Sequence, residues 1–151
     1  MQECVLVASE KEGSLLLLEA RRGAVLRTFK GCNARPGAVC VLAGHSSFQG
    51  VGGAGDHIYA AQDKRATVNV WSWANSNVQL QCHVQEIVTC LCPHPSGQYV
   101  FGGSRSGKIY VWQSSSGALV RTVNAHYRGI TRCKVSSCGT YLVTGSEDST
   151  V

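Results

Sequence analysis

Residues 96–109 read Ser-Gly-Gln-Tyr-Val-Phe-Gly-Gly-Ser-Arg-Ser-Gly-Lys-Ile, and residues 138–151 repeat the pattern 42 positions later as Cys-Gly-Thr-Tyr-Leu-Val-Thr-Gly-Ser-Glu-Asp-Ser-Thr-Val. Trp71 and Trp112 end matching apolar stretches 41 positions apart, and Leu18 takes their place in a weaker first copy. Alternating apolar residues between glycine-rich turns are typical of short β-strands. The repeat therefore predicts a fold built from successive copies of one small β-sheet.

The repeat period indicates which all-β fold this is. Repeats of about 40–45 residues, each closed by an aromatic residue, build β-propellers at about one four-stranded blade per repeat. At that period the 151 residues supply about three and a half four-stranded blades, out of about seven in a closed ring. We expect one incomplete propeller domain over residues 1–151, with blades at approximately 1–32, 33–83, 84–125 and 126–151, the last one truncated.

The third repeat gives the clearest strand plan. Alternating apolar residues predict its strands at 87–92, 99–103, 109–112 and 118–123. A shift of 41 positions predicts strands of the second blade at 38–42, 58–61, 68–71 and 78–82. A shift of 94 positions predicts three strands and no obvious innermost one in the first blade. The fourth blade keeps two complete strands, at 130–135 and 141–145.

The composition is that of an ordinary globular domain, with 44% hydrophobic and 15% charged residues. No apolar run approaches the ~18 residues of a membrane span, and Met1-Gln-Glu-Cys does not begin a signal peptide. We therefore expect a nuclear or cytosolic protein whose eight cysteines are reduced thiols. The net charge of +5 is compatible with an anionic partner but does not require one.

Two glycine motifs resemble nucleotide-binding loops. Residues 50–55 fit G-x-G-x-x-G, but a strand pattern follows them where a dinucleotide site needs a helix N-terminus. Residues 102–108 fit G-x-x-x-x-G-K, but Ile109 stands where a P-loop has Ser or Thr. We interpret both as turns and predict no cofactor.

Cysteine and histidine residues cluster between the second and third blades: Cys82, His83, Cys90, Cys92 and His94. Thiolate and imidazole suit tetrahedral zinc, but neither C-x-x-C nor H-x-x-x-H spacing is present. Buried thiols are the better interpretation, and we predict no metal ligands. Since no nucleophile, base and oxyanion site come together, we also predict no catalytic residues and no enzyme.

The polar residues of the fourth blade resemble those of WD40 repeats. In that family a His and an Asp join a strand Ser or Thr and the terminal Trp in a buried network that locks the blade. The resemblance implies this structural role for His126, Thr144 and Asp148, and it makes Trp71 and Trp112 the blade-closing aromatic residues. Ser106 and Arg65 stand at the Asp position of the third and second blades, so those blades should lack the network.

Basic residues gather in the turns expected on one face of the propeller: Lys64, Arg65, Arg105, Lys108 and Arg128. Such a rim suits RNA phosphates or an acidic protein segment. Solvated turn residues without a partner remain the simpler interpretation.

Three stretches resemble the WD-repeat subunits of Rix-type complexes, which mature the large ribosomal subunit: residues 59–62 followed by Val70-Trp71, residues 87–91 with 96–100, and residues 125–131. The stretch from His126 to Thr131 is the most specific, because WD repeats usually have Gly-His there. The resemblance implies a non-enzymatic nuclear or nucleolar scaffold that aids processing of pre-rRNA internal spacers.

The same resemblance implies protein partners: Rix-type and Tex/Ipi-type subunits, a midasin-type AAA ATPase and the pre-ribosome. No membrane partner is expected, and self-association is in doubt because the chain matches only the N-terminal half of such proteins. Two alternatives stay open. One is a WD40 adaptor of another assembly, such as a ubiquitin ligase or signalling complex, in the cytoplasm; the other is a propeller that contacts rRNA directly through the basic rim.

Overall fold

The computed structural model describes residues 3–9, 13–32, 36–42 and 57–151. These residues form strands and turns without a helix, which confirms the all-β prediction. Their strands are β1 (Cys4–Ala8), β2 (Leu15–Glu19), β3 (Val25–Phe29), β4 (Pro36–Leu42), β5 (His57–Gln62), β6 (Thr67–Ser72), β7 (Leu80–His83), β8 (Val88–Pro93), β9 (Tyr99–Ser104), β10 (Lys108–Gln113), β11 (Leu119–Asn124), β12 (Ile130–Val135) and β13 (Leu142–Ser146). No helix in the described residues is long and apolar enough to span a membrane.

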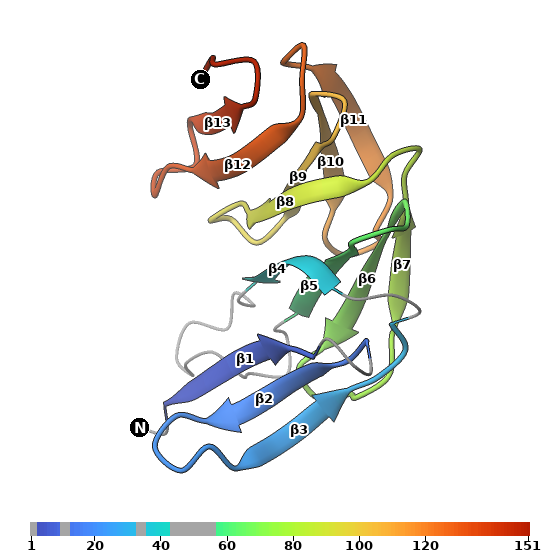
Figure 1. The fold of residues 1–151 in the computed structure, drawn as a ribbon, viewed down its shortest axis with the longest axis vertical. Helices are drawn as coiled ribbons and strands as arrows, with labels where there is room; N and C mark the ends of the chain where they lie inside the picture. Colours follow the sequence, from blue (N-terminus) through green and yellow to red (C-terminus); the bar gives the residue numbers. More distant parts are fainter. Residues whose placement is uncertain (1–2, 10–12, 33–35, 43–56) are drawn as a thin grey trace.

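The strands form four antiparallel sheets in chain order, as consecutive blades of a propeller do. Their strand orders are β1-β2-β3, β4-β5-β6-β7, β8-β9-β10-β11 and β12-β13. Figure 1 shows the sheets following one another along an arc, with both chain ends on the left of the view. The inner strands β4 and β12 both contact β8, whereas β7 and β11 lie on the outer side of the arc.

Backbone hydrogen bonds in the third and fourth sheets repeat at the 42-residue offset of the sequence. The bond from His94 N to Tyr99 O is 2.9 Å long, and so is the bond from Ser136 N to Tyr141 O. In the turn after β9, the bond from Arg105 N to Ile87 O is 3.1 Å long. Its equivalent after β13, from Glu147 N to Gly129 O, is 3.0 Å long. The sequence repeat is therefore a repeat of backbone geometry.

The first sheet matches the outer strands of the third at the 94-residue offset. Gly23 and Gly117 both have a φ of 67°, in the left-handed region that glycine adopts without a Cβ penalty. The bulge between Leu17 and Leu18 in β2 corresponds to the bulge beside Trp112 in β10. Leu18 therefore occupies the tryptophan position of a sheet that lacks a counterpart of β8 among the described residues.

The hydrophobic core lies between neighbouring sheets rather than within one of them. Trp71 and Ile58 of the second sheet pack against Leu15 and Phe29 of the first. The opposite face of the second sheet packs against Trp112 and other residues of the third. Because the second sheet is covered on both faces, its central strands β5 and β6 are buried almost continuously rather than alternately.

Candidate interaction surface

A buried hydrogen-bond network joins the loop before β12 to the turn after β13. The structure brings His126, Thr144 and Asp148 together. Nε2 of His126 lies 2.8 Å from Thr144 Oγ1, and Nδ1 lies 3.2 Å from Asp148 Oδ2. Thr150, which the sequence interpretation omits, places its hydroxyl 2.8 Å from Nδ1 and donates to Asp148 Oδ1.

The Asp148 carboxylate has more donors than the histidine ring alone. The backbone N–H of Tyr127 donates to Oδ2 at 2.9 Å, and that of Thr150 donates to Oδ1 at 3.0 Å. The Thr150 hydroxyl, these backbone donors and the His126 ring hold the pKa of Asp148 well below its usual range, against the opposing effect of burial. An ionised carboxylate therefore fixes the loop before β12 to the turn after β13.

We expect His126→Ala to destabilise the fold by about 2 kcal/mol, because the buried Thr144 hydroxyl and the Asp148 carboxylate lose a partner. The free energy of unfolding from urea denaturation measures this. His83→Ala is the matched control, because that imidazole is exposed and has no side-chain partner among the described residues. Equal losses in the two variants would show that the network does not stabilise the sheet.

The same network predicts sensitivity to acid. A carboxyl whose pKa is lower in the folded state stabilises the fold above its unfolded pKa of about 4, and this contribution is lost as the pH falls further. The urea midpoint of the unmodified chain should therefore fall between pH 5 and pH 3 more steeply than that of Asp148→Asn. If the urea midpoints of the two proteins fell equally steeply with pH, the acid sensitivity would not come from the Asp148 carboxylate.

The basic residues of the predicted rim lie in the turns of the second, third and fourth sheets. Lys64 and Arg65 belong to the β5–β6 turn, Arg105 to the β9–β10 turn and Arg128 to the loop before β12, and all four are exposed. Lys108 differs, because its Nζ lies 2.7 Å from Oε1 of Glu86. The rim therefore presents four of the five predicted cations to solvent.

Glu86 precedes β8, and the sequence interpretation overlooks it. Burial opposes ionisation of its carboxyl, but hydrogen bonds from Lys108, Ser106 and Ser104 outweigh burial and lower the pKa. The third sheet thus holds a carboxylate where the fourth has the His126 network.

The motifs that resemble cofactor sites form ordinary structure wherever it is described. Residues 50–55 lie outside the described residues. Residues 102–108 form the end of β9 and its tight turn to β10, with Gly107 at a φ of 89°.

Burial raises the pKa of Cys82 to about 11, so this thiol is protonated at neutral pH. Within the described ranges no group of three or more His, Cys, Asp or Glu side chains is placed to hold a metal ion.

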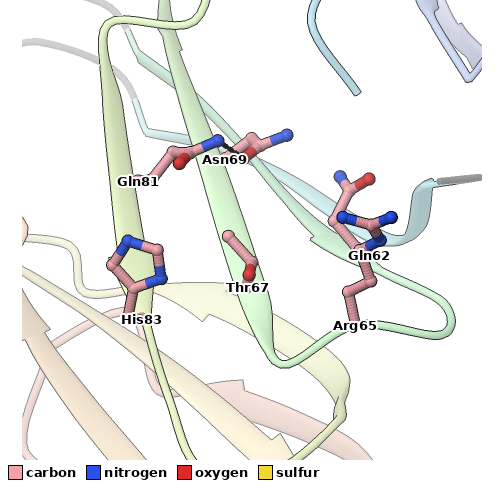
Figure 2. A pocket seen from close by; sticks show the side chains of 6 residues that line it. All are labelled: Gln62, Arg65, Thr67, Asn69, Gln81 and His83. Carbon is pink, nitrogen blue, oxygen red and sulfur yellow. Dashed lines mark hydrogen bonds between the residues drawn. The ribbon is translucent and has the colours of Figure 1, made fainter. Parts of the chain in front are cut away.

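A small polar pocket opens on the second sheet, beside Arg65. Its cavity measures about 160 Å³, and its lining residues are Gln62, Arg65, Thr67, Asn69, Gln81 and His83. Figure 2 shows Asn69 and Gln81 side by side at one end, Gln62 and Arg65 at the other, and Thr67 and His83 below. This pocket could not be predicted from the sequence, because polar residues that alternate with apolar ones along a strand are typical of a solvated face.

Two amide side chains of the pocket are almost completely buried: Gln62 and Asn69 are each 2% exposed. Asn69 Oδ1 accepts a hydrogen bond of 3.1 Å from Gln81 Nε2, and Nδ2 reaches the Gly31 carbonyl only at 3.5 Å. Thr67 pairs with His83 across β6 and β7, and Asn69 pairs with Gln81, so four of the lining side chains share one face of the sheet.

The antiparallel sheets follow one another in chain order and pack face to face, and the last one carries a His–Thr–Asp network. These features define a propeller-type repeat protein. The family model described as WD domain, G-beta repeat matches residues 75–113 and 117–151. The chain therefore carries WD40 repeats in these residues.

Its relatives include proteins named for pre-rRNA processing. Pre-rRNA-processing protein IPI3 of Candida albicans is 38% identical over 120 residues, covering 64% of this chain and 24% of that protein. The protein of the same name from Mycosarcoma maydis is 31% identical over 126 residues, covering 83% and 22%. Protein ROOT INITIATION DEFECTIVE 3 of Arabidopsis thaliana is 29% identical over 92 residues, covering 61% and 21%. The chain thus spans less than a quarter of the length of these curated relatives.

Proposed function

We propose that this chain is part of a WD40 scaffold subunit that acts in large-ribosomal-subunit assembly and in processing of pre-rRNA internal spacers. The observation that carries the proposal is the 38% identity to a protein named for pre-rRNA processing. The fold also supports the proposal, because stacked sheets expose turns and sheet edges that other proteins can contact.

The proposed scaffold works without catalysis and in the nucleus, in the nucleolus and nucleoplasm. Its proposed partners are Rix-type and Tex/Ipi-type subunits, a midasin-type AAA ATPase and the pre-ribosome. The exposed cations Lys64, Arg65, Arg105 and Arg128 supply a surface for an acidic partner segment or for rRNA phosphates. The roles of the His126 network and of the two buried tryptophans are, on this proposal, to hold neighbouring blades in register.

Affinity purification combined with depletion tests the proposal. A tagged form of the protein should recover large-subunit precursor particles, and its depletion should make pre-rRNA that still contains internal spacers accumulate. Tagged Gly23→Ala, at an exposed turn with no atom near the added Cβ, serves as a control that should recover the same particles. Recovery of a ubiquitin ligase or signalling complex, with unchanged pre-rRNA, would replace the proposal by the adaptor alternative.

A further inference from the structure

The third sheet shows how a turn of this chain holds a carboxylate. Three of the side chains that contact Glu86 come from this turn: Ser104 ends β9, Ser106 lies two residues before β10, and Lys108 begins β10. The closest contact is the ion pair of 2.7 Å between Lys108 Nζ and Glu86 Oε1. Here the carboxylate comes from the same chain, two residues before β8.

The second sheet has the same three positions, occupied by different residues. Gln62 ends β5, Arg65 lies two residues before β6, and Thr67 begins β6. All three line the polar pocket. Their side chains supply an amide, a guanidinium and a hydroxyl, which are all hydrogen-bond donors.

The second sheet differs in the residues around this place. Among the described residues none of the six that line the pocket is an Asp or a Glu, so no carboxylate lines it. Within the part of the chain that the structure describes, the Arg65 guanidinium and the Thr67 hydroxyl have no hydrogen-bond partner.

We propose that this pocket binds the carboxylate of an Asp or Glu side chain from an extended segment of a partner protein. Arg65 pairs with the carboxylate from the rim, and Thr67 donates to it from β6. The exposed Gln81, held through Asn69, offers its amide to the backbone of the same segment. The contact is an intermolecular version of the one that Glu86 makes within the chain.

The size and charge of the pocket favour a single carboxylate over RNA. A volume of about 160 Å³ holds the end of one side chain, whereas pockets for drug-sized ligands run to roughly 300–1,000 Å³. Arg65 is the only Lys or Arg among the six lining residues. A phosphodiester strand presents successive charges and is bound by several cations, so one guanidinium matches one carboxylate better.

Nuclear magnetic resonance titration of the 151-residue chain tests the proposal directly. The probe is N-acetylglutamate N-methylamide, with the glutamine analogue as its neutral control. Shifts should map to Gln62, Thr67 and Asn69, with a Kd on the order of 1 mM and about tenfold weaker binding of the neutral analogue. Equal affinity for both compounds, or shifts confined to other residues, would overturn the proposal.

Two exposed arginines provide the matched pair of variants. Arg65→Gln should weaken binding about tenfold, since a charge-assisted hydrogen bond is lost. Arg121→Gln removes the same charge from the exposed strand β11, outside the basic rim, and should leave the affinity almost unchanged. Equal losses would indicate unspecific attraction to a basic surface. Tighter binding of hexauridylate or inorganic phosphate at the same resonances would assign the pocket to phosphate instead.

A third variant tests the comparison between the two sheets. Glu86→Ala empties the carboxylate site of the third sheet while leaving Ser104, Ser106 and Lys108 in place. It should therefore add a second set of probe-dependent shifts, at Ser104 and Lys108. If Glu86→Ala adds no probe-dependent shifts at Ser104 and Lys108, the contact that Glu86 makes does not represent how the pocket binds a carboxylate, and the proposal is overturned.

Discussion

Gly107→Ala is expected to destabilise the fold by about 4 kcal/mol, through strain at the junction of the third and fourth sheets. The residue has a φ of 89°, and a Cβ built on it would lie 2.2 Å from the His126 carbonyl oxygen. That oxygen belongs to the backbone and cannot rotate away. The Gly107 carbonyl also accepts hydrogen bonds from the N–H groups of Ala125 and His126, at 3.2 and 3.0 Å. Moving the Gly107 turn or the loop before β12 to make room therefore weakens both bonds.

Urea denaturation and the thermal midpoint measure the effect of Gly107→Ala, which should lower Tm by roughly 10 °C in a chain of this size. Gly23→Ala is the control for backbone strain alone, because its φ is 67° and no atom lies within 4 Å of the added Cβ. It should cost only about 1–2 kcal/mol. If Gly107→Ala costs no more than this control, close packing of the two backbones does not limit the junction.

Much of this fold follows from the sequence because the repeat transfers assignments from clear copies to unclear ones. The pattern at 96–109 predicts a strand from Tyr99, and β9 begins there. The 94-residue offset predicts three strands in the first sheet, which lacks a tryptophan, and the described residues form three there. The division into one domain with four blades stays a prediction. The approach of His126 to Gly107 needs the packing of two sheets and is not visible in either repeat alone.

The polar contacts were predictable only where the sequence resembles WD40 repeats. His126 and Asp148 match the His and Asp positions of those repeats, whereas Val84 and Ser106 stand at the equivalent positions of the third repeat. Glu86 is not recognisable, because one acidic residue before a strand reads as a solvated loop residue. The polar pocket could not be predicted for a similar reason. Asn69 alternates with apolar residues along β6, which is typical of a solvent-facing residue, but it is only 2% exposed.

The two buried tryptophans should differ in what their indole groups contribute. Trp71 Nε1 donates a hydrogen bond of 2.9 Å to the Lys30 carbonyl of the preceding sheet. Trp112 Nε1 is buried without an acceptor among the described residues, and its ring stacks on Tyr110 at a centroid distance of 5.9 Å. Trp71→Ala should cost about 5 kcal/mol, at the upper end for a buried aromatic residue, because the Lys30 carbonyl also loses its donor.

Phenylalanine at each site separates the hydrogen bond from the packing. Trp71→Phe keeps much of the apolar contact but leaves the Lys30 carbonyl unpaired, so we expect a loss of about 3 kcal/mol. Trp112→Phe removes a buried donor that has no partner, which offsets part of the lost packing, and should cost about 1 kcal/mol. Urea denaturation followed by circular dichroism measures both variants, since fluorescence changes with the number of tryptophans. A loss at Trp112 equal to or larger than that at Trp71 would show that packing, and not the bond to Lys30, determines how strongly each tryptophan holds neighbouring sheets together.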